Sequence, residues 1–399
     1  MSKQIQEAYI VAATRTPVAR RNGQFRSVRP DDLLAHVLNA VLAGVPGLDP
    51  REIGDVIVGC AMPEAEQGMN VARIGLLLAG LPETVPGITL NRFCASGLQA
   101  VADAAARIRL GEAEVMIAAG TESMSAMPQI MGNKVSLNPA IFARPENIGI
   151  AFGMGLTAEQ VAGQWQVSRE DQDAFALESH RRACAAITAG HFRDEITPYT
   201  VRAHLPGEDG TVRITERQCD TDEGPRAETS LEALGKLRPV FAARGSVTAG
   251  NSSQMSDGAG AVLLMSESAL KRYDATPVAR FCSYAVAGVS PRIMGIGPVE
   301  AIPRALAAAG VGRDDIGWIE LNEAFAAQAL AVMRQLELDP ARVNPLGGAI
   351  ALGHPLGATG AIRCATLIHA MQRDPGLRHG MISMCIGTGM GAAGVFERV

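Results

Sequence analysis

The sequence predicts an α/β protein made of two similar halves, with a subdomain inserted into the first half. Three observations lead to this fold class. Apolar segments of strand length alternate with segments of helical periodicity. One strand–turn–helix–strand pattern occurs twice, and over residues 122–246, between the two copies, it is lost and charged residues become denser. Alternating strands and helices are typical of layered α/β folds with buried, mostly parallel strands.

The first copy of the pattern begins with an Ala/Leu-rich helix near residues 32–43 and an apolar strand within 51–59. A turn containing Cys94 then leads into a helix near 97–109, followed by a buried strand at 115–119. The apolar residues of the helix near 97–109 fall on one face at helical spacing: Leu98, Val101, Ala102, Ala105 and Ile108.

The second copy repeats these elements in the same order. A helix near 298–309 precedes a strand at 316–321, and a turn containing His354 leads into a helix near 359–371. A strand at 381–386 follows. Thr359 is the expected N-cap of the helix near 359–371, whose apolar face carries Ile362, Ala365 and Ile368. The last strand of each copy is expected to end in a Gly-Thr pair.

The repeat sets the expected domain organisation of the 399 residues. Residues 1–121 and 247–272 are expected to form the first half, and residues 273–399 the second half. Residues 122–246 are expected to form an inserted loop subdomain that extends from the first half.

Composition excludes several classes of protein. The formal net charge of −5 argues against a nucleic-acid-binding protein. The seven cysteines include no CxxC pair and no zinc-type spacing, which indicates free thiols in a reducing compartment and no metal site. The apolar run at 8–13 is too short for a signal peptide, and no segment approaches the roughly 18 apolar residues that span a membrane. We therefore expect a cytoplasmic protein without a membrane span.

Two residues lie in turns that favour chemistry. Cys94 directly precedes a helix, where the dipole and unpaired N–H groups favour the nucleophilic thiolate. The alternative is a small residue that fills a turn. His354 lies in a run rich in glycine and proline at 344–360, which suggests a loop that places a side chain; the alternative is a structural turn.

Two further residues lie at strand ends, where ligands bind in α/β sheets. Cys385 ends the last strand of the second copy, and Asn322 follows its first strand. A core cysteine and a helix N-cap are the alternatives. Because the duplication places Cys94, Asn322, His354 and Cys385 at strand ends or in the turns that follow, we expect one shared site.

Two more patterns are rejected as binding motifs. Residues 389–394 satisfy GxGxxG, but the chain ends five residues later, which leaves no room for the helix and second strand of a dinucleotide-binding unit. His180 and Cys184 have helical spacing but no further ligands nearby, so we expect a solvated helix face rather than a metal site.

Several motifs together resemble those of the thiolase family over essentially the whole chain. They are residues 91–98 around Cys94, 248–253, 256–259, 322–326, 347–360 around His354, and 385–391. The resemblance implies the five-layered α-β-α-β-α thiolase fold. It also implies reversible, CoA-dependent cleavage of 3-ketoacyl-CoA to acetyl-CoA and a shortened acyl-CoA through an acyl-cysteine.

The resemblance also implies roles for single residues. Cys94 would be the acylated nucleophile, His354 its activating base and Cys385 the second acid/base. Asn322, acting through a water, would form one oxyanion site with His354. The backbone N–H groups of Cys94 and Gly387 would form the other.

Contacts with coenzyme A are implied in the same way. Arg226 would lie near the adenosine phosphates, Ser253 on the pantetheine arm, and Phe241 and Phe325 on the apolar wall. Coenzyme A would be a substrate, with no permanently bound cofactor and no metal. The family also implies a homodimer or homotetramer and, as a further partner, a multienzyme assembly of fatty-acid β-oxidation.

The chain departs from the short-chain biosynthetic members of the family at one position. Those members carry His-Met-Gly in the loop domain, where this chain has Gly153 in place of the histidine. This difference favours a degradative 3-ketoacyl-CoA thiolase over an acetyl-CoA acetyltransferase that makes acetoacetyl-CoA. The same fold could also serve a non-catalytic acyl-CoA-binding protein or a decarboxylating ketosynthase. Both are disfavoured, because a carrier would not need Cys385 and such ketosynthases typically lack a second catalytic cysteine.

Overall fold

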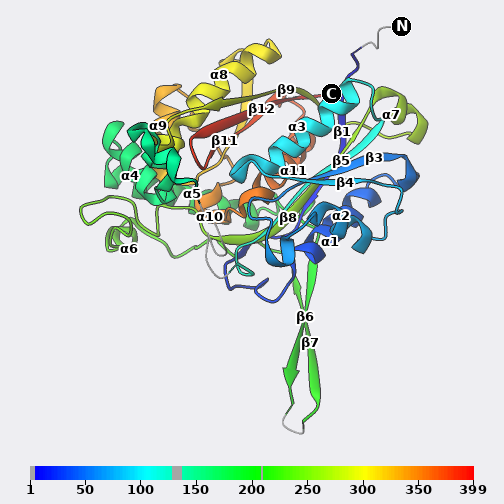
Figure 1. Ribbon diagram of the computed structural model, residues 1–399, viewed down its shortest axis with the longest axis horizontal. Coiled ribbons are helices and arrows are strands. Elements are labelled where there is room, and N and C mark those ends of the chain that lie inside the picture. Colours follow the sequence, from blue (N-terminus) through cyan, green and yellow to red (C-terminus); the bar gives the residue numbers. More distant parts are fainter. Residues whose placement is uncertain (1–4, 128–136, 208–209) are drawn as a thin grey trace.

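The computed structural model describes residues 5–127, 137–207 and 210–399 (Figure 1). Its main feature is a ten-stranded sheet in the order β10-β11-β12-β9-β1-β8-β5-β3-β4, with β2 paired to β8. The strands of the first half are β1 (Tyr9–Arg15), β2 (Ala19–Arg20), β3 (Ile53–Gly59), β4 (Gly87–Leu90), β5 (Val115–Ser123) and β8 (Ser256–Met265). Those of the second half are β9 (Ala279–Gly288), β10 (Ile316–Leu321), β11 (His379–Ile386) and β12 (Met390–Arg398).

The predicted duplication is confirmed in the sheet. The order β1-β8-β5-β3 in one half corresponds to β9-β12-β11-β10 in the other. Strand directions also correspond, because β3–β5 and β10–β11 are parallel pairs and the remaining neighbours in both series are antiparallel. The two halves of the sheet meet through a short pairing of Tyr9 and Ile10 with Arg280 and Ala279.

The expectation of mostly parallel strands is wrong. β5 and β8 are antiparallel, as are β11 and β12, so each half is a mixed sheet. The physical reason is visible in the second half, where β11 turns back into β12 through a tight hairpin at 387–389 instead of a helical crossover. The Gly-Thr-Gly sequence there is a turn signal.

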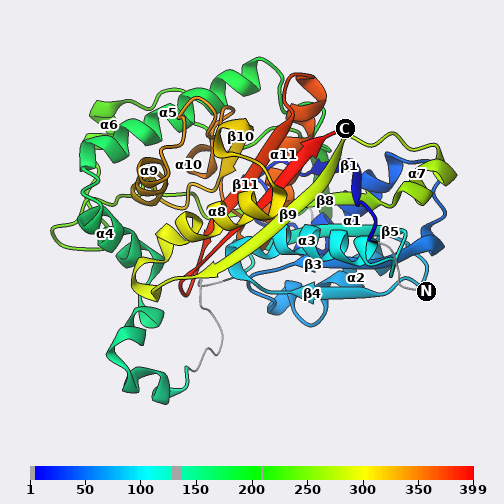
Figure 2. The ribbon, with the colours of Figure 1, turned by 90° about the horizontal axis from the view of Figure 1, so that it is seen from above.

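Helices form three layers around and between the two halves of the sheet. α3 (Ser96–Arg109) and α11 (Thr359–Arg373) lie between them and share one apolar core with both (Figure 2). α1 (Pro30–Ala43) and α2 (Val71–Leu78) cover the outer face of the first half. α8 (Gly297–Ala309) and α9 (Ala326–Gln335) cover that of the second. The five-layered α-β-α-β-α arrangement is therefore confirmed.

The central helices show what helical periodicity can and cannot predict. All five apolar residues expected on one face of α3 are buried in the shared core. In α11 the buried set extends around the helix and includes Thr359, Arg363 and Thr366. A helix packed between two sheets has no solvent face, so a single apolar stripe underestimates its burial.

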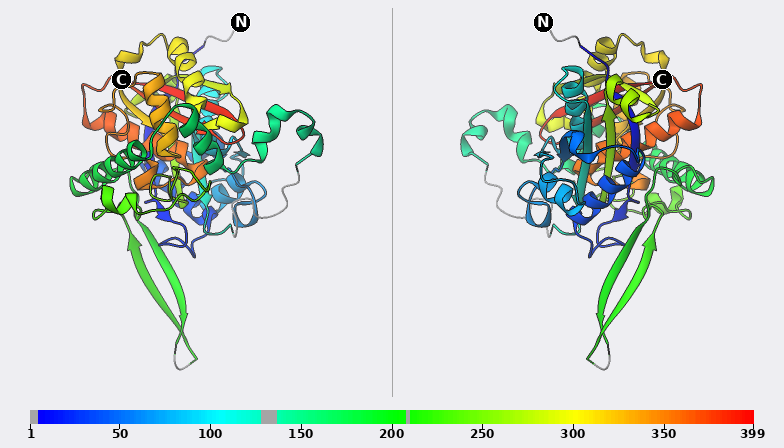
Figure 3. Two further views of the ribbon diagram at one scale, coloured as in Figure 1. Left: turned by 90° about the vertical axis from the view of Figure 1, so that its left-hand side faces the viewer. Right: turned by 90° about the vertical axis from the view of Figure 1, so that its right-hand side faces the viewer.

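The remaining elements belong mostly to the region between the two copies of the pattern. A long hairpin of β6 (Tyr199–Pro206) and β7 (Val212–Cys219) projects from the body, as does the segment around residues 139–151 (Figure 3). The remaining helices are α4 (Met154–Gln164), α5 (Arg169–Thr188), α6 (Leu231–Gly235), α7 (Glu267–Tyr273) and α10 (Ala349–Leu352). Short 3-10 turns are η1 (Pro50–Glu52), η2 (Ala65–Gln67), η3 (Phe93–Ala95), η4 (Pro139–Ala143), η5 (Pro145–Ala151), η6 (Pro291–Ile296), η7 (Arg313–Asp315) and η8 (Leu356–Ala358).

Local chemistry explains several element boundaries. α1 begins at Pro30, and Asp31 and Asp32 follow in its first turn. Negative side chains there interact favourably with the positive end of the helix dipole. The Ser168 side chain caps α5 by accepting a hydrogen bond from the backbone N–H of Asp171. Gly310 ends α8 in the left-handed conformation, with φ of 65°. β5 runs to Ser123, so the Gly120-Thr121 pair lies inside the strand instead of ending it.

Within the described ranges, no helix is both long enough and apolar enough to cross a membrane.

Candidate active site

The turn that carries Cys94 is fixed by its own neighbours. Phe93 has φ of 45°, in the left-handed region, and its N–H donates to Asn91 Oδ1 over 2.8 Å. Ser96 Oγ accepts from the Arg92 N–H at 2.8 Å and donates to the Phe93 carbonyl at 2.7 Å. Cys94 is thereby held in η3, immediately before the first turn of α3.

The helix start alone does not make Cys94 a thiolate in the resting protein. Burial of the sulfur raises the pKa of the Cys94 thiol to about 11, although hydrogen bonds from the backbone N–H groups of Gly387 and Cys94 act in the opposite direction. Loss of water around the sulfur outweighs these donors and the helix dipole. The thiol is therefore protonated at neutral pH, and its activation requires a base.

His354 is held at both ring nitrogens. Its Nδ1 lies 2.6 Å from Thr359 Oγ1, and its Nε2 lies 3.3 Å from Asn322 Nδ2. With the Asn322 amide as a donor to Nε2, the neutral ring carries its proton on Nδ1 and its lone pair on Nε2. Burial, followed by the charge of Arg363, lowers the pKa of His354 to about 3. The ring is therefore neutral at physiological pH.

Thr359 does not cap α11 as predicted. It is the first residue of the helix, and Ala358 occupies the N-cap position without a side-chain bond. The Thr359 hydroxyl contacts the His354 ring instead. Sequence reasoning missed this contact because a threonine just before an apolar helical pattern can be either the N-cap or the first residue of the helix.

Asn322 is not a helix cap, which was the alternative interpretation of this residue. α9 begins at Ala326, and its N-cap is Phe325. The Asn322 side chain is buried, and within the described part of the chain its Oδ1 has no hydrogen-bond partner. The amide of Asn322 therefore faces the site, with one side toward His354.

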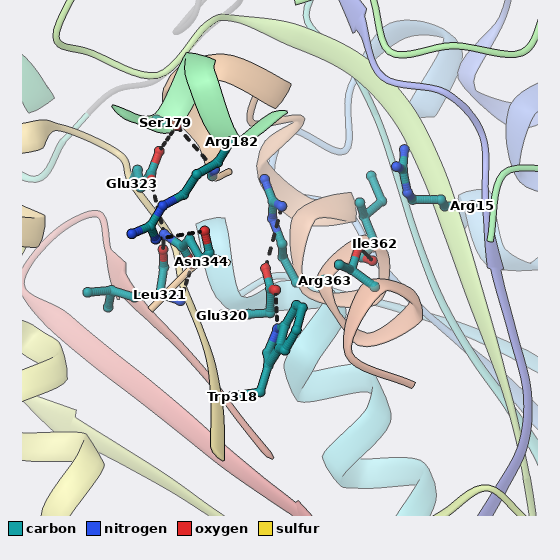
Figure 4. A network of polar contacts seen from close by, with 12 residues as sticks. Arg15, Ser179, Arg182, Trp318, Glu320, Leu321, Glu323, Asn344, Ile362 and Arg363 are labelled. Atoms are coloured by element: carbon teal, nitrogen blue, oxygen red, sulfur yellow. Dashed lines mark hydrogen bonds and ion pairs between the residues drawn. The ribbon is translucent and has the colours of Figure 1, made fainter. Parts of the chain in front are cut away.

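A buried polar network supports the loop of Asn322 (Figure 4). The Glu323 carboxylate accepts from Ser179 Oγ at 2.7 Å, from Asn344 Nδ2 at 2.8 Å and from the Ile350 N–H at 3.2 Å. Asn344 also bonds both the N–H and the carbonyl of Leu321. The network joins the end of β10 to the loop that leads to His354.

Cys385 and Gly387 lie at the hairpin between β11 and β12. Cys385 is fully buried, and burial followed by the charge of a Cys94 thiolate raises its pKa well above the ordinary range. The hairpin turns at Thr388 and Gly389, both with positive φ, which leaves the Gly387 N–H directed at the Cys94 sulfur. The two cysteines therefore share one site.

Close contact between the two central helices brings the halves of the site together. A Cβ atom on Gly97 would lie 2.6 Å from the Ala361 nitrogen, and one on Gly360 would lie 2.0 Å from the Leu98 nitrogen. Such distances leave no room for a side chain, so only glycine permits this approach. The approach places the turn of Cys94 against the turn that follows His354.

Glu122 strengthens the same junction and was missed from the sequence. Its buried carboxylate accepts from the N–H groups of Ala61 at 2.7 Å and Gly357 at 2.9 Å, and from Gln67 Nε2 at 2.5 Å. Burial raises the pKa of Glu122. The available signal was an acidic residue within an otherwise apolar strand segment.

The residues expected to contact coenzyme A lie on neighbouring loops. Arg226 is exposed and lines a cavity of about 140 Å³ together with Thr229, Gly250 and Gln254. The Ser253 N–H bonds the Ala324 carbonyl at 2.9 Å. Phe241 and Phe325 pack edge to face, with ring centroids 6.1 Å apart. Phe325 belongs to the same small apolar cluster as Cys385, which places this wall beside the site.

The expectation of a solvated face for His180 is wrong. His180 is buried, and its Nδ1 accepts a hydrogen bond from the Arg226 N–H at 3.2 Å. Burial, followed by the charge of Arg226, lowers the pKa of His180 to about 4. Spacing along the helix could not show that the loop at 222–226 folds over this face. In the described ranges, no three His, Cys, Asp or Glu side chains are grouped as metal ligands would be.

Comparison with known proteins agrees with this architecture. The family model for the thiolase N-terminal domain matches residues 8–268, and that for the thiolase C-terminal domain matches residues 275–398. A 3-ketoacyl-CoA thiolase of Bacillus subtilis is 51% identical over 395 residues, which cover 98% of this chain and 100% of the relative.

Two crystal structures match the whole fold. The Bacillus anthracis acetyl-CoA acetyltransferase is 39% identical with a TM-score of 0.90, and the human mitochondrial 3-ketoacyl-CoA thiolase is 38% identical with a TM-score of 0.88. Each alignment covers 100% of both chains. The chain therefore belongs to the thiolase family.

Proposed function

We propose that this protein cleaves 3-ketoacyl-CoA with free CoA, reversibly, to give acetyl-CoA and a shortened acyl-CoA through an acyl-Cys94 intermediate. The observation that carries the proposal is the arrangement around the Cys94 sulfur. The sulfur accepts from the N–H groups of Gly387 and of Cys94 itself, and a second cysteine, Cys385, lies close enough to interact with it. The turn after His354 packs against the same helix start.

In the first half-reaction, neutral His354 takes the Cys94 proton and the thiolate attacks the 3-keto carbon. The N–H groups of Cys94 and Gly387 receive the negative charge on the former keto oxygen. The C2–C3 bond then breaks, and the electron pair passes into the enolate of acetyl-CoA. The protonated His354 and Asn322, acting through a water, stabilise this enolate, while Cys385 protonates its carbon.

In the second half-reaction, the Cys385 thiolate deprotonates the incoming CoA thiol. CoA attacks the acyl-Cys94 thioester, whose developing oxyanion again lies against the N–H groups of Cys94 and Gly387. Cys94 leaves as a thiolate and recovers its proton from His354. All groups return to their starting protonation states, and one thioester has replaced another.

The resting charges fit this sequence. A Cys94 pKa of about 11, raised by burial, and a His354 pKa of about 3, lowered by burial and Arg363, make both groups neutral before substrate binds. Charge develops only when the substrate supplies an oxygen that the hydrogen-bond donors can stabilise. Cys94 is thereby a poor nucleophile towards other electrophiles in the free enzyme.

The name of the Bacillus subtilis relative supports the 3-ketoacyl substrate class. So does position 153, where a Cβ on glycine would meet no atom within 4 Å, and where α4 begins beside the site. The neighbouring Met154 sulfur lies 3.6 Å from the position of a Cβ on Gly387. A flexible side chain thus lies beside the turn of Gly387, which suits acyl chains of different shape.

Turnover with a series of substrates tests the proposal. Purified enzyme, acetoacetyl-CoA and free CoA should lose the absorbance of the 3-keto enolate, and two molecules of acetyl-CoA should form for each acetoacetyl-CoA consumed. Repeating the assay up to 3-ketohexadecanoyl-CoA should give higher kcat/KM for substrates longer than acetoacetyl-CoA. An enzyme that cleaves none of them at high concentration would reject the function.

The region 122–246 is proposed to act as an inserted subdomain that supplies contacts with CoA through Arg226 and Phe241. Substitution of Arg226 with alanine is expected to raise the KM for CoA by about five- to tenfold, because a charge-assisted phosphate contact is lost. The change in kcat should be small, since the adenosine end is bound equally in ground and transition states. Arg202→Ala on the projecting hairpin is the control. An unchanged KM at low salt would reject the contact.

The protein is also proposed to form a homodimer through β4, and higher oligomers from that dimer. β4 is the edge strand of the sheet, and an edge strand offers backbone groups for pairing with another chain. Exposed apolar side chains lie on β4, on α2 and just before α2. These side chains are Met69, Leu77, Leu78 and Ile88. Two copies of one edge can pair around a two-fold axis and cover this patch.

The double variant Leu78→Glu/Ile88→Lys should sediment as a monomer at concentrations where the wild type is a dimer. Both side chains lie on the exposed patch, so the substitutions place charges in the pairing surface without entering the core. Leu110→Lys, on an exposed leucine elsewhere, is the matched control. A double variant with the sedimentation coefficient of the wild type would reject this interface.

Cellular placement follows from the thiols. All seven cysteines, of which four are buried, are free in the structure, and a cytoplasmic location is proposed because that compartment keeps thiols reduced. A role in fatty-acid β-oxidation is also proposed, with or without a multienzyme partner, because this reaction would consume the 3-ketoacyl-CoA of that pathway.

A further inference from the structure

A buried ion pair lies one layer behind the candidate active site. Arg363 on α11 and Glu320 on β10 approach to 3.5 Å between Nη1 and Oε2, with side chains 5% and 1% exposed (Figure 4). The indole Nε1 of Trp318 donates to the other carboxylate oxygen at 2.6 Å. Two charges removed from water are costly unless they are paired and hydrogen-bonded. The reaction described above uses neither of them.

The pair joins the two elements that hold His354. Arg363 is one helical turn beyond Thr359, so both lie on the same face of α11. Glu320 lies near the end of β10, two residues before Asn322, which directly follows the strand. Thr359 contacts one ring nitrogen of His354, and Asn322 contacts the other.

Resting on the proposed function, we propose that Arg363 and Glu320 are positioning residues of the thiolase reaction. Their ion pair fixes the start of α11 against the end of β10. Thr359 and Asn322 are thereby held at the separation that lets them bind Nδ1 and Nε2 of His354 together. A shift of one element against the other would release one of the two contacts.

The charge of Arg363 has a second consequence for the base. After burial, it is the next cause of the low pKa of His354, because a cation disfavours the imidazolium. Burial raises the pKa of Glu320 to about 7, while Arg363 acts in the opposite direction. Among the described residues, other titratable groups near this region include Glu195 and Glu323, whose charges act on Glu320, and Arg15, which pairs with Glu195. Cys94, Glu122 and Cys385 belong to the adjoining candidate site.

A purely structural role makes different predictions. Buried ion pairs can often be replaced by neutral side chains without loss of fold, and such a pair would matter only for the free energy of unfolding. Variants would then melt at another temperature, but the folded fraction would have normal kcat and an unchanged pH profile. The positioning role instead predicts changes in kcat and in the acid limb of the profile.

Three variants separate these roles. Arg363→Met removes the charge and keeps the length, Arg363→Lys keeps the charge, and Glu320→Gln keeps an acceptor for Trp318. The control is Arg107→Met, which breaks a helix-to-strand ion pair in the other half, where Arg107 Nη1 lies 2.8 Å from Asp55 Oδ2. Acetoacetyl-CoA thiolysis is measured from pH 4 to pH 9 and normalised to the folded fraction from circular dichroism. This range lies above the wild-type His354 pKa of about 3, which burial and Arg363 lower, so an acid limb that moves to higher pH enters the range and becomes visible.

For Arg363→Met we expect kcat to fall about tenfold or more, with KM within about twofold, because small displacements of catalytic groups have effects of this size. Its acid limb should move to higher pH, since the imidazole loses a nearby cation. Arg363→Lys should recover most of the rate and keep the limb in place. Glu320→Gln should lower kcat without raising the limb. Arg107→Met should match the wild type in both.

Normal kcat and an unchanged acid limb in folded Arg363→Met and Glu320→Gln would overturn the inference while leaving the thiolase function intact. Absence of thiolysis in the wild type would instead reject the proposed function itself. If Arg363→Met does not fold, the comparison of Arg363→Lys with Glu320→Gln decides, because Arg363→Lys keeps the positive charge and Glu320→Gln keeps the side-chain length and an acceptor for Trp318.

Discussion

Replacing Cys385 with alanine should leave an enzyme that still takes an acetyl group from acetyl-CoA but no longer cleaves acetoacetyl-CoA. In the proposed mechanism acetylation uses Cys94, His354 and the N–H groups of Cys94 and Gly387, and Cys385 only returns a proton to the departing CoA thiolate, which water can also supply. Release of the enolate, by contrast, requires an acid placed at its carbon. Loss of a general acid typically lowers a rate by about 10²- to 10⁴-fold. Thiolysis should fall by this factor, while the yield of labelled acetyl-enzyme stays near that of the wild type.

Two further variants make this prediction decisive. Cys94→Ala should lose both activities, because no thioester can form. Cys364→Ala, at a buried cysteine in the core of α11, should retain both. Thiolysis by Cys94→Ala, with labelled acetyl on Cys385, would show that the two roles are reversed.

Replacing His354 with glutamine should slow both half-reactions at neutral pH. With burial raising the pKa of Cys94 to about 11, only about one thiol in 10⁴ is ionised at pH 7 without a base. The rate of acetyl-enzyme formation by the variant should therefore rise about tenfold per pH unit in alkaline buffer. The wild type should lack this steep rise, because its base is already neutral above the His354 pKa of about 3, which burial and Arg363 lower.

A histidine outside the site provides the control for this experiment. His369 lies on α11 and bonds the Ala13 carbonyl at 2.9 Å, so His369→Gln should retain the pH profile of the wild type. Equal rates for His354→Gln and the wild type at neutral pH would exclude His354 as the base.

Much of the architecture could be predicted because it depends on local pattern. The duplicated strand–helix–strand units, and the apolar face of α3 from Leu98 to Ile108, follow from periodicity within short windows. Strand direction could not be predicted in this way. β8 lies between β1 and β5 although it follows β5 by more than a hundred residues, so its pairing depends on the whole fold.

The candidate site shows the same division. Cys94, His354, Asn322 and Cys385 stand in motifs that are specific in themselves, and their turns do meet through Gly97 and Gly360. Their supporting partners come from distant positions. The Glu122 carboxylate receives the Gly357 N–H, and no local pattern couples residues so far apart.

The extent to which burial raises the pKa of Cys94 could not be predicted for a related reason. A helix start is visible in the sequence, but the water excluded from around a sulfur atom depends on packing from both halves. His180 is a second case, because a loop from another part of the inserted region covers its helix face. Desolvation is a property of the assembled structure.

The most direct test of the account is to locate the acetyl group on the wild-type enzyme. The protein is incubated with radiolabelled acetyl-CoA alone, quenched in acid, digested and mapped by mass spectrometry. We expect label in the peptide that contains Cys94, and its removal when free CoA is added before the quench. Label on Cys385 or another cysteine, or thiolysis that proceeds without any acetyl-enzyme, would contradict the assignment of Cys94 as the nucleophile.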